Sequence, residues 1–342
     1  MTSRASQNVL AAGLILIAAL TPHLGAAQQL TVSGFPGVIG NNIKKSFVET
    51  YDRSSTVRYL ESWDSARFTQ MQANRSKPKE DVVTFTDLTL PLAGAAGLLD
   101  VLDVKAIPAL AEVDPFVRSQ SDVGVAFTYG CFGIAYNSKY VTKPITSWAD
   151  LLRDDLKGHV SAPNVTYTGA FNTLDGLSRT KGKSLTSPED GMAMYRTIRT
   201  SGPGLWDQES IAVGGLKTGE IWATPYFSGN VLAMMADPDL KDLRFVVPSE
   251  GAYYVPLTVA KVKNGPAGGD GADRFINNML TVANQEKSAA LGKTRPVNVK
   301  ANVPADVAAS CPLANKLNKV DVEYLNRNRE KIVNQWNQIV NR

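Results

Sequence analysis

The residues that could hold a ligand are mostly neutral hydrogen-bond donors and aromatic rings. They gather where predicted strands end or predicted helices begin, which is where α/β proteins place their binding sites. The predicted binding residues are Phe35, Thr84, Thr86, Asp87, Thr166, Tyr167, Thr168, Tyr226, Ser228, Tyr253 and Tyr254. Only one of them is an acid. Such side chains suit the binding of a small polar molecule by hydrogen bonds and ring contacts.

The histidine content argues against several kinds of catalysis. The chain has two histidines, His23 and His159, and His23 lies in the N-terminal leader described below. One remaining histidine cannot build a multi-histidine metal site. It also leaves a single candidate base for a nucleophile–histidine pair. We therefore predict no metal, no cofactor and none of the usual hydrolytic centres.

The segment 166–169, Thr-Tyr-Thr-Gly, points to a charged ligand group. It leads into a predicted helix, and the N-terminus of a helix presents unpaired N–H groups that attract anions. A carboxylate or phosphonate of a small anionic or zwitterionic solute would fit there. The alternative is that Thr166 or Thr168 only caps the helix through its hydroxyl.

The N-terminus has the pattern of a cleavable signal peptide. Arg4 precedes an apolar stretch at 9–20, and Gly25-Ala26-Ala27 forms a small-residue cleavage site. We expect residues 1–27 to be removed, with no lipid anchor because no cysteine follows the cleavage region. The predicted location is the periplasm. The formal charge of +4 includes no long run of Lys or Arg, so nucleic acid is not an expected partner.

The two cysteines, Cys131 and Cys311, leave two possibilities open. An even count in an oxidising compartment allows one disulfide. A buried thiol and a separate surface thiol are an equal alternative, because the two positions are distant in the sequence.

The first part of the mature chain alternates strands and helices. Strands are predicted at 29–33, 57–60 and 81–85, with helices at 43–51 and 65–75. This alternation predicts a parallel sheet with crossover helices. Ligands bind beyond the carboxyl ends of such strands, which here selects the segments 34–38 and 84–88.

Residues 127–160 carry the most distinctive motif, FTYGCFGIAYNSKYVTKPITSWADLLRDDLKGHV. A strand with a Gly-Cys-Phe-Gly centre is followed by a proline loop and a short helix that buries Trp148. Later segments are the loop 226–230, the pair Glu250-Gly251, and a terminal helix with Asn-Arg-Asn-Arg at 326–329 and Trp336. In this order they resemble periplasmic solute-binding proteins of ABC importers. The group that they resemble handles polyamines, ferric iron, thiamine and phosphonates.

The resemblance implies an α/β fold of the type II periplasmic binding class, with two lobes joined by hinge strands around a ligand cleft. Lobe one would comprise residues 28–127 plus 252–304, lobe two 128–251, and a C-terminal helical segment 305–342. It also implies a monomer that captures a small molecule and delivers it to an ABC permease in the inner membrane. A sensor that presents its closed form to a membrane receptor remains an alternative.

Three alternatives concern the chemistry of the cleft. Polyamine binders of this fold use carboxylates, but 164–168 and 253–257 contain none, so a small anionic or zwitterionic solute is favoured. Tyr253 and Tyr254 resemble the paired phenolates of ferric-iron binders. Thiaminase-like enzymes share the fold and would use Cys131 as nucleophile, yet no motif ties a base to it. We therefore predict a binding protein and not an enzyme.

Overall fold

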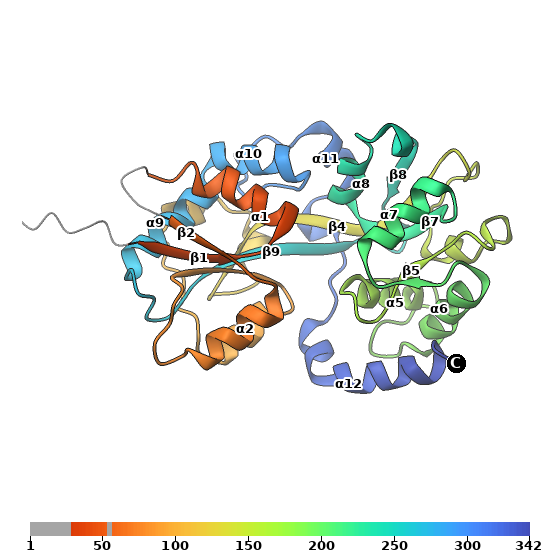
Figure 1. Cartoon of the computed structure of the whole chain (residues 1–342), viewed down its shortest axis with the longest axis horizontal. Helices are drawn as coiled ribbons and strands as arrows, with labels where there is room; N and C mark the ends of the chain where they lie inside the picture. Colours follow the sequence, from red (N-terminus) through yellow and green to blue (C-terminus); the bar gives the residue numbers. More distant parts are fainter. Residues whose placement is uncertain (1–28, 53–56) are drawn as a thin grey trace, which may run out of the picture.

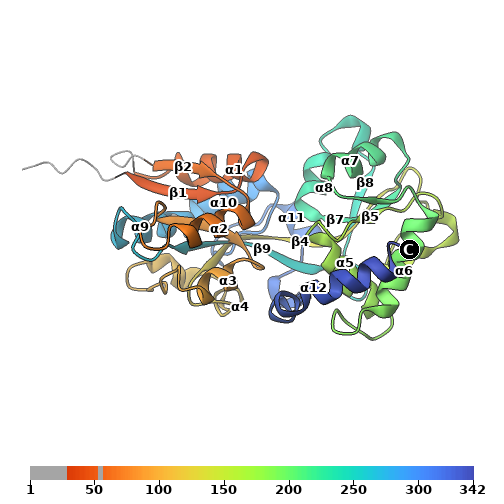
Figure 2. The same cartoon turned by 60° about the horizontal axis from the view of Figure 1, so that its bottom comes forward.

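The computed structural model describes residues 29–52 and 57–342, so the predicted signal peptide lies outside the described residues. Figure 1 shows two α/β lobes connected by long strands, and the view in Figure 2 separates them equally clearly. This confirms the predicted fold class. Within the described part of the chain, no helix combines the length and the apolar character needed to cross a membrane.

One mixed sheet runs through both lobes in the order β2-β1-β3-β9-β4-β7, and β8 also pairs with β4. β1 is parallel to β2 and to β3, whereas β9 is antiparallel to β3 and β4. A second sheet consists of the parallel pair β5 and β6. The strands are β1 (Leu30–Gly34), β2 (Val57–Glu61), β3 (Val82–Thr86), β4 (Val125–Asn137), β5 (Ala162–Pro163), β6 (Leu205–Trp206), β7 (Ala223–Phe227), β8 (Leu243–Val246) and β9 (Tyr253–Lys261).

Helices cover both faces of the sheet in lobe one. Alternate residues of β3 serve the two faces, since Val82 packs in one apolar cluster and Val83 in another. The helices of this lobe are α1 (Gly37–Ile43), α2 (Asp64–Ala73), α3 (Leu90–Ala95), α4 (Pro115–Arg118), α9 (Gly269–Leu280) and α10 (Val282–Gly292). The first helix begins at Gly37, earlier than the predicted residue 43. The extended residue Pro36 is its N-cap, so the helix follows β1 almost directly.

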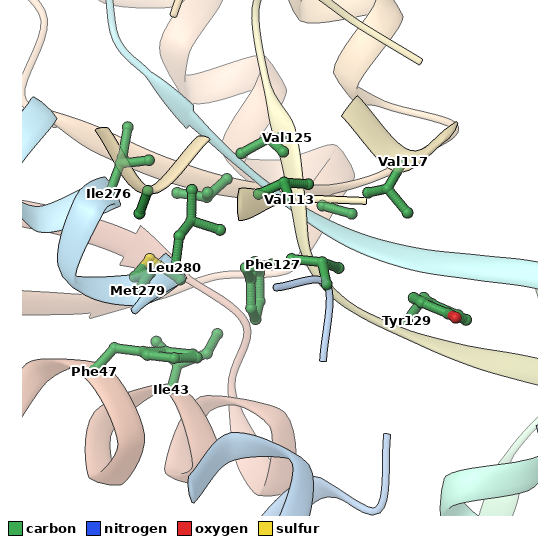
Figure 3. Close-up of a cluster of buried hydrophobic side chains, with 14 of the residues drawn as sticks. Ile43, Phe47, Val113, Val117, Val125, Phe127, Tyr129, Ile276, Met279 and Leu280 are labelled. Carbon is green, nitrogen blue, oxygen red and sulfur yellow. The ribbon is translucent and has the colours of Figure 1, made fainter. Parts of the chain in front are cut away.

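The larger core of lobe one lies between α1, α9 and the start of β4. Figure 3 shows Ile43 and Phe47 facing Met279 and Leu280, with Phe127 between the two groups. Phe47 and Phe127 meet edge to face at 5.6 Å. All of these side chains are buried. Their packing fixes the start of β4 against α1 and α9.

Lobe two is built around Trp148, which is fully buried as predicted. Glu250 holds the start of the short helix that carries this tryptophan, because its carboxylate accepts hydrogen bonds from Ser147 Oγ at 2.5 Å and Trp148 N at 3.2 Å. The helices of this lobe are α5 (Gly169–Arg179), α6 (Glu189–Ser201), α7 (Glu209–Thr218), α8 (Ser228–Met234) and α12 (Val322–Ile339). α11 (Ala305–Ser310) lies next to α8 (Figure 1).

β4 and β9 pass from one lobe to the other as an antiparallel pair. On β4, Cys131 belongs to the core of lobe one and Phe132 to the core of lobe two. On β9, Tyr254 belongs to the core of lobe one and Tyr253 to the core of lobe two. The hinge therefore consists of two paired strands whose neighbouring residues serve different cores.

The chain crosses between the lobes a third time, near Asn318, which the sequence did not predict. The backbone of Asn318 accepts a hydrogen bond from Tyr254 N at 2.9 Å and donates one to Ala252 O at 2.9 Å. Beyond this point α12 packs Leu325, Ile332 and Trp336 into the core of lobe two. The predicted C-terminal segment 305–342 is thus divided, because Cys311, Ala314 and Leu317 pack in the core of lobe one and the residues of α12 in that of lobe two.

A disulfide joins Cys131 to Cys311, with 5.4 Å between the two Cα atoms. Cys131 lies on β4 and Cys311 follows α11. The bond ties a hinge strand to the segment that leads into the third crossing.

Candidate functional site

The carboxyl ends of β1, β2 and β3 meet at one edge of lobe one. In Figure 1 β1 runs toward lobe two, so this edge faces the other lobe. It carries Trp63 after β2, and Thr86 and Asp87 at the end of β3, while Phe35 after β1 is buried beneath them. We call these residues the lobe-one face.

Trp63 is the most exposed part of this face, with 63% of its surface accessible. Its ring meets Phe35 edge to face at 6.5 Å, and Phe35 itself is buried. A fully buried guanidinium lies beneath, with Arg67 Cζ 5.2 Å from the centre of the Phe35 ring. Burial lowers the pKa of Arg67 to about 10, so it stays charged at neutral pH and is anchored by Ser33 and backbone carbonyls. The exposed ring of Trp63 therefore packs on Phe35, whose position is fixed by the buried Arg67 side chain.

Two carboxyl groups lie at the lobe-one face. Asp64 is 3.6 Å from Arg67 and accepts hydrogen bonds from the backbone and side chain of Thr86. Asp87 is half-buried and forms no ion pair among the described residues. Burial raises the pKa of Asp87 to about 7, against the opposing effects of nearby backbone N–H groups and Lys319. Asp87 is thus a carboxyl group that a cation would help to ionise.

The start of α5 forms the opposite face, on lobe two. Thr166 and Thr168 are exposed and Tyr167 is half-buried. The hydroxyl of Thr168 does not cap α5, and neither threonine hydroxyl has a hydrogen-bond partner in the described part of the chain. The helix behind them is buried from Gly169 to Ser178. The N–H groups of Ala170 and Phe171 already donate to Tyr167 O at 3.0 Å and Thr168 O at 3.4 Å. Of the N–H groups at this N-terminus, those of Thr168 and Gly169 make no hydrogen bond among the described residues and could meet an anion.

Arg329 of α12 adds a second positive group at this point. Its guanidinium carbon lies 5.4 Å from the ring of Phe171, which is in the first turn of α5. Figure 2 shows α12 running beside α5. Arg329 is exposed and has no ion pair or hydrogen bond within residues 29–52 and 57–342. We call the start of α5 together with Arg329 the lobe-two face.

The acid nearest to this face is already engaged. Glu209, the first residue of α7, accepts hydrogen bonds from the hydroxyls of Tyr167 and Tyr226 and from Asn230 Nδ2 at 3.1 Å. Burial and the adjacent Glu209 carboxylate raise the pKa of both tyrosines, which keeps them protonated as donors. Glu209 therefore fixes the tyrosine rings behind the threonines, and three of its hydrogen-bond positions are already occupied.

Comparisons with known proteins agree with this architecture. The model of the family described as bacterial extracellular solute-binding protein matches residues 77–328. The chain belongs to this family. A comparison with curated protein sequences finds no match.

Three solved structures show what this solute-binding protein is similar to in fold. An ABC transporter protein from Clostridium perfringens is 22% identical, with a TM-score of 0.78 over 91% of this chain and 99% of that one. An extracellular solute-binding protein from Bordetella parapertussis is 20% identical, with a TM-score of 0.80 over 91% and 98%. A spermidine/putrescine ABC transporter substrate-binding protein from Streptococcus pneumoniae is 20% identical, with a TM-score of 0.76 over 92% and 99%.

The structure brings five of the predicted binding residues to the two faces and buries the other six. Thr86 and Asp87 lie on the lobe-one face, and Thr166, Tyr167 and Thr168 on the lobe-two face. The predicted residues that are less than a tenth exposed are Phe35, Thr84, Tyr226, Ser228, Tyr253 and Tyr254. These six side chains present little surface in this structure, and their contact with a ligand stays a prediction.

The pair Tyr253-Tyr254 cannot hold one metal ion between two phenolates. Neighbouring residues of a strand point to opposite faces, and here the two rings enter different cores. The hydroxyl of Tyr253 donates to Asp175 at 2.6 Å inside lobe two. The two tyrosines therefore cannot be the paired ligands of a ferric ion. The described residues contain no cluster of three acids, histidines or cysteines that could hold a metal ion instead.

The enzyme alternative loses its nucleophile. Cys131 is bonded to Cys311, and a sulfur in a disulfide cannot attack as a thiolate. Its backbone N–H donates to Ser228 Oγ at 3.1 Å, which explains why Ser228 is buried.

Trp63, Arg329 and Glu209 were not predicted as site residues. Trp63 follows a predicted strand in the same way as Phe35 does, so the rule that selected Phe35 applies to it equally. Arg329 lies at helical spacing between Leu325 and Ile332, and an arginine within an apolar stripe is a visible signal. Nothing in the sequence links Glu209 to the two tyrosines.

Proposed function

We propose that this protein is the substrate-binding component of an ABC importer and that its ligand is a small zwitterionic solute. The cationic end of the ligand binds the lobe-one face, at Asp87 and the ring of Trp63. Its carboxylate or phosphonate binds the lobe-two face, at the start of α5 and Arg329. The opposite charges of the two faces carry this proposal.

Each end of the ligand meets chemistry suited to its charge. An ammonium group gains from a carboxylate and from the face of an indole ring. An anion gains from backbone N–H groups at a helix start and from a guanidinium, which can donate two parallel hydrogen bonds. Closure of the two lobes about the β4–β9 hinge would bring both sets of groups to one molecule.

A polyamine is the second candidate, and one observation favours it. Asp64, Asp87 and Trp63 form a suitable seat for an ammonium group, and the related Streptococcus pneumoniae protein is named for spermidine and putrescine. The second ammonium group of a diamine would face Arg329 and the positive start of α5. The three groups that donate to the carboxylate of Glu209 are neutral, so this carboxylate would offset only part of that repulsion through its charge.

A matched set of four-carbon compounds tests the proposal. 4-Aminobutyrate, putrescine and succinate share a chain length and differ only in the charges at their ends. We expect 4-aminobutyrate to raise the melting temperature by mass action and the other two to have little effect. The three-carbon and five-carbon homologues and the corresponding aminophosphonates extend the series. Preferential stabilisation by putrescine would establish the polyamine alternative instead.

We further propose that the mature protein begins at Gln28, acts in the periplasm as a monomer and carries no lipid anchor. N-terminal sequencing and light scattering of the exported protein test these points. The importer role predicts that the loaded protein stimulates ATP hydrolysis by its permease complex. A sensor would bind the same ligand without this stimulation.

The proposed lobe boundaries remain 28–127 plus 252–304 and 128–251. The cores divide at Cys131–Phe132 and Tyr253–Tyr254, within about four residues of these boundaries, which supports them approximately. Limited proteolysis tests them, since cleavage should spare the paired hinge strands.

A further inference from the structure

A pocket of about 180 Å³ lies in lobe one, away from both faces described above. It is lined by residues just before β3 begins, such as Glu80, and just after β9 ends, such as Lys263. β3 runs toward lobe two and β9 starts at the hinge, so the pocket is at the far end of the sheet. It is therefore separate from the proposed interlobe site.

Glu80 is the unusual residue of this pocket. It is 4% exposed, and its Oε2 atom has no hydrogen-bond partner within the described ranges. The next residue, Asp81, is also buried, but its carboxylate accepts hydrogen bonds from Thr31 N at 2.8 Å and Ala267 N at 2.6 Å. Asp81 therefore joins segments of the fold, whereas Glu80 makes no such bond. Arg67 interacts with Glu80 through charge, but no hydrogen bond to this carboxylate is found in the described part of the chain. A buried carboxylate without a hydrogen-bond partner is costly, and a cation in the adjoining pocket would offset part of that cost.

The remaining lining limits what that group can be. Met71, Leu98 and Val262 are each less than a tenth exposed and present an apolar wall. Arg75 and Lys263 are exposed at the pocket and form no ion pair among residues 29–52 and 57–342. A bare metal cation would meet one carboxylate and two positive side chains, which is a poor set of ligands.

We propose that this pocket is a second small-molecule site, for a short aliphatic amino acid. The ammonium group of the ligand binds the carboxylate of Glu80. Its carboxylate lies between Arg75 and Lys263, and its hydrocarbon chain packs on Met71, Leu98 and Val262. The volume is adequate, because an engineered apolar cavity of about 150 Å³ in another protein holds benzene.

The methyl group of Met71 offers a readout that is specific to this pocket. The chain has seven methionines, and methyl-labelled methionine gives each of them its own NMR signal. Replacing Met71 by Leu identifies its signal. Three probes are compared: norvaline, pentanoate, which lacks the ammonium group, and butylamine, which lacks the carboxylate.

We expect norvaline to shift the Met71 signal saturably, and pentanoate and butylamine to bind at least roughly tenfold more weakly. Glu80→Gln should weaken norvaline by a similar factor without unfolding the protein, because the amide keeps the shape of the side chain and removes only its charge. Arg329→Ala, which disables the interlobe site under the proposed function, should leave the Met71 response intact. The two sites are thereby tested independently.

Several outcomes would overturn the inference. They are an unchanged Met71 signal at millimolar norvaline, an unchanged response in the Glu80→Gln variant, and a larger response to calcium than to norvaline. Equal binding of butylamine and norvaline would show that the pocket recognises an amine alone and would overturn the assignment to amino acids.

Discussion

The two faces that meet across the hinge differ in how they acquire their charge. The lobe-one face has a carboxyl group, Asp87, that ends a strand without forming an ion pair among the described residues, whereas its second acid, Asp64, lies 3.6 Å from Arg67. The lobe-two face gains a positive charge from Arg329, which lies against the first turn of the buried helix α5. Lobe two also has a nearby acid, Glu209, which three neutral donors hold in place. The charge of a binding face thus depends on how its charged groups are paired and placed, and not only on which residues are present.

Among the changes considered, reversing the charge of Arg329 should lower the affinity for the ligand most, because it removes the positive charge of the lobe-two face. In Arg329→Glu the lobe-two face loses a cation and gains an anion beside the start of α5. We expect the affinity for a zwitterionic ligand to fall roughly a hundredfold, measured by calorimetry. The matched control is Arg327→Glu, since Arg327 is on the same helix but pairs with Glu323 at 2.9 Å. Equal losses in the two variants would remove Arg329 from the site.

Neutralising Asp87 should have the next largest effect. Asp87→Asn keeps the shape of the lobe-one face and removes its unpaired charge, so the affinity for a ligand with an ammonium group should fall about tenfold. A ligand with two anionic ends should instead bind no worse. If the zwitterion bound the variant as well as it binds the parent protein, the lobe-one face would not be its cationic seat.

The pH dependence follows from the same carboxyl group. Because burial raises the pKa of Asp87 to about 7, affinity should increase as the pH rises through about 7, and Asp87→Asn should abolish this increase. The ligand-free protein should show the opposite trend in stability. Between the unfolded pKa of about 3.9 and about 7, the unfolded chain releases the proton while the folded chain keeps it. The contribution of Asp87 therefore lowers the free energy of unfolding as the pH rises, which urea titrations of both proteins can measure.

Glu209 should affect binding less, because it acts through Tyr167. Glu209→Gln retains one oxygen acceptor but loses the charge that holds both tyrosine hydroxyls, so we expect a loss of about fivefold. Tyr226→Phe removes only one donor to Glu209 and leaves Tyr167 bound, which makes it the matched control. A larger loss in Tyr226→Phe would mean that Tyr226 contacts the ligand itself.

The smallest effect is expected for Thr168→Ala. If this threonine capped α5, its removal would cost about 1 kcal/mol of stability. Its hydroxyl forms no capping hydrogen bond, so we expect unchanged chemical denaturation and a loss of affinity of about threefold. A destabilised variant with unaltered affinity would restore the capping role.

The sequence predicted the architecture better than the site. Alternating strands and helices, and the ordered motifs around Trp148 and Glu250, were sufficient for the fold because they are local patterns. The positions at strand ends were also predictable, and Thr86 and Asp87 followed from them. The same rule would have selected Trp63 had it been applied to the strand that ends at Glu61.

The sequence did not show which of the predicted binding side chains are buried. Tyr226 follows the predicted strand 222–225, but in the structure it lies within β7, and its buried ring contacts Trp206 and Phe227. Tyr253 and Tyr254 were taken as one pair, although strand alternation alone separates them. The third crossing was missed because it rests on backbone bonds between Asn318 and a strand more than sixty residues earlier.

The division of β9 between two cores has a consequence for folding. The core of lobe one joins Leu30 to Leu317, and that of lobe two joins Phe132 to Val340. Neither core can close while the chain is still short, so most native contacts must wait for residues near the C-terminus. Such non-local closure slows folding. We therefore expect newly made chains to remain open until synthesis is nearly complete, and chains that end before α12 to lack a stable second lobe.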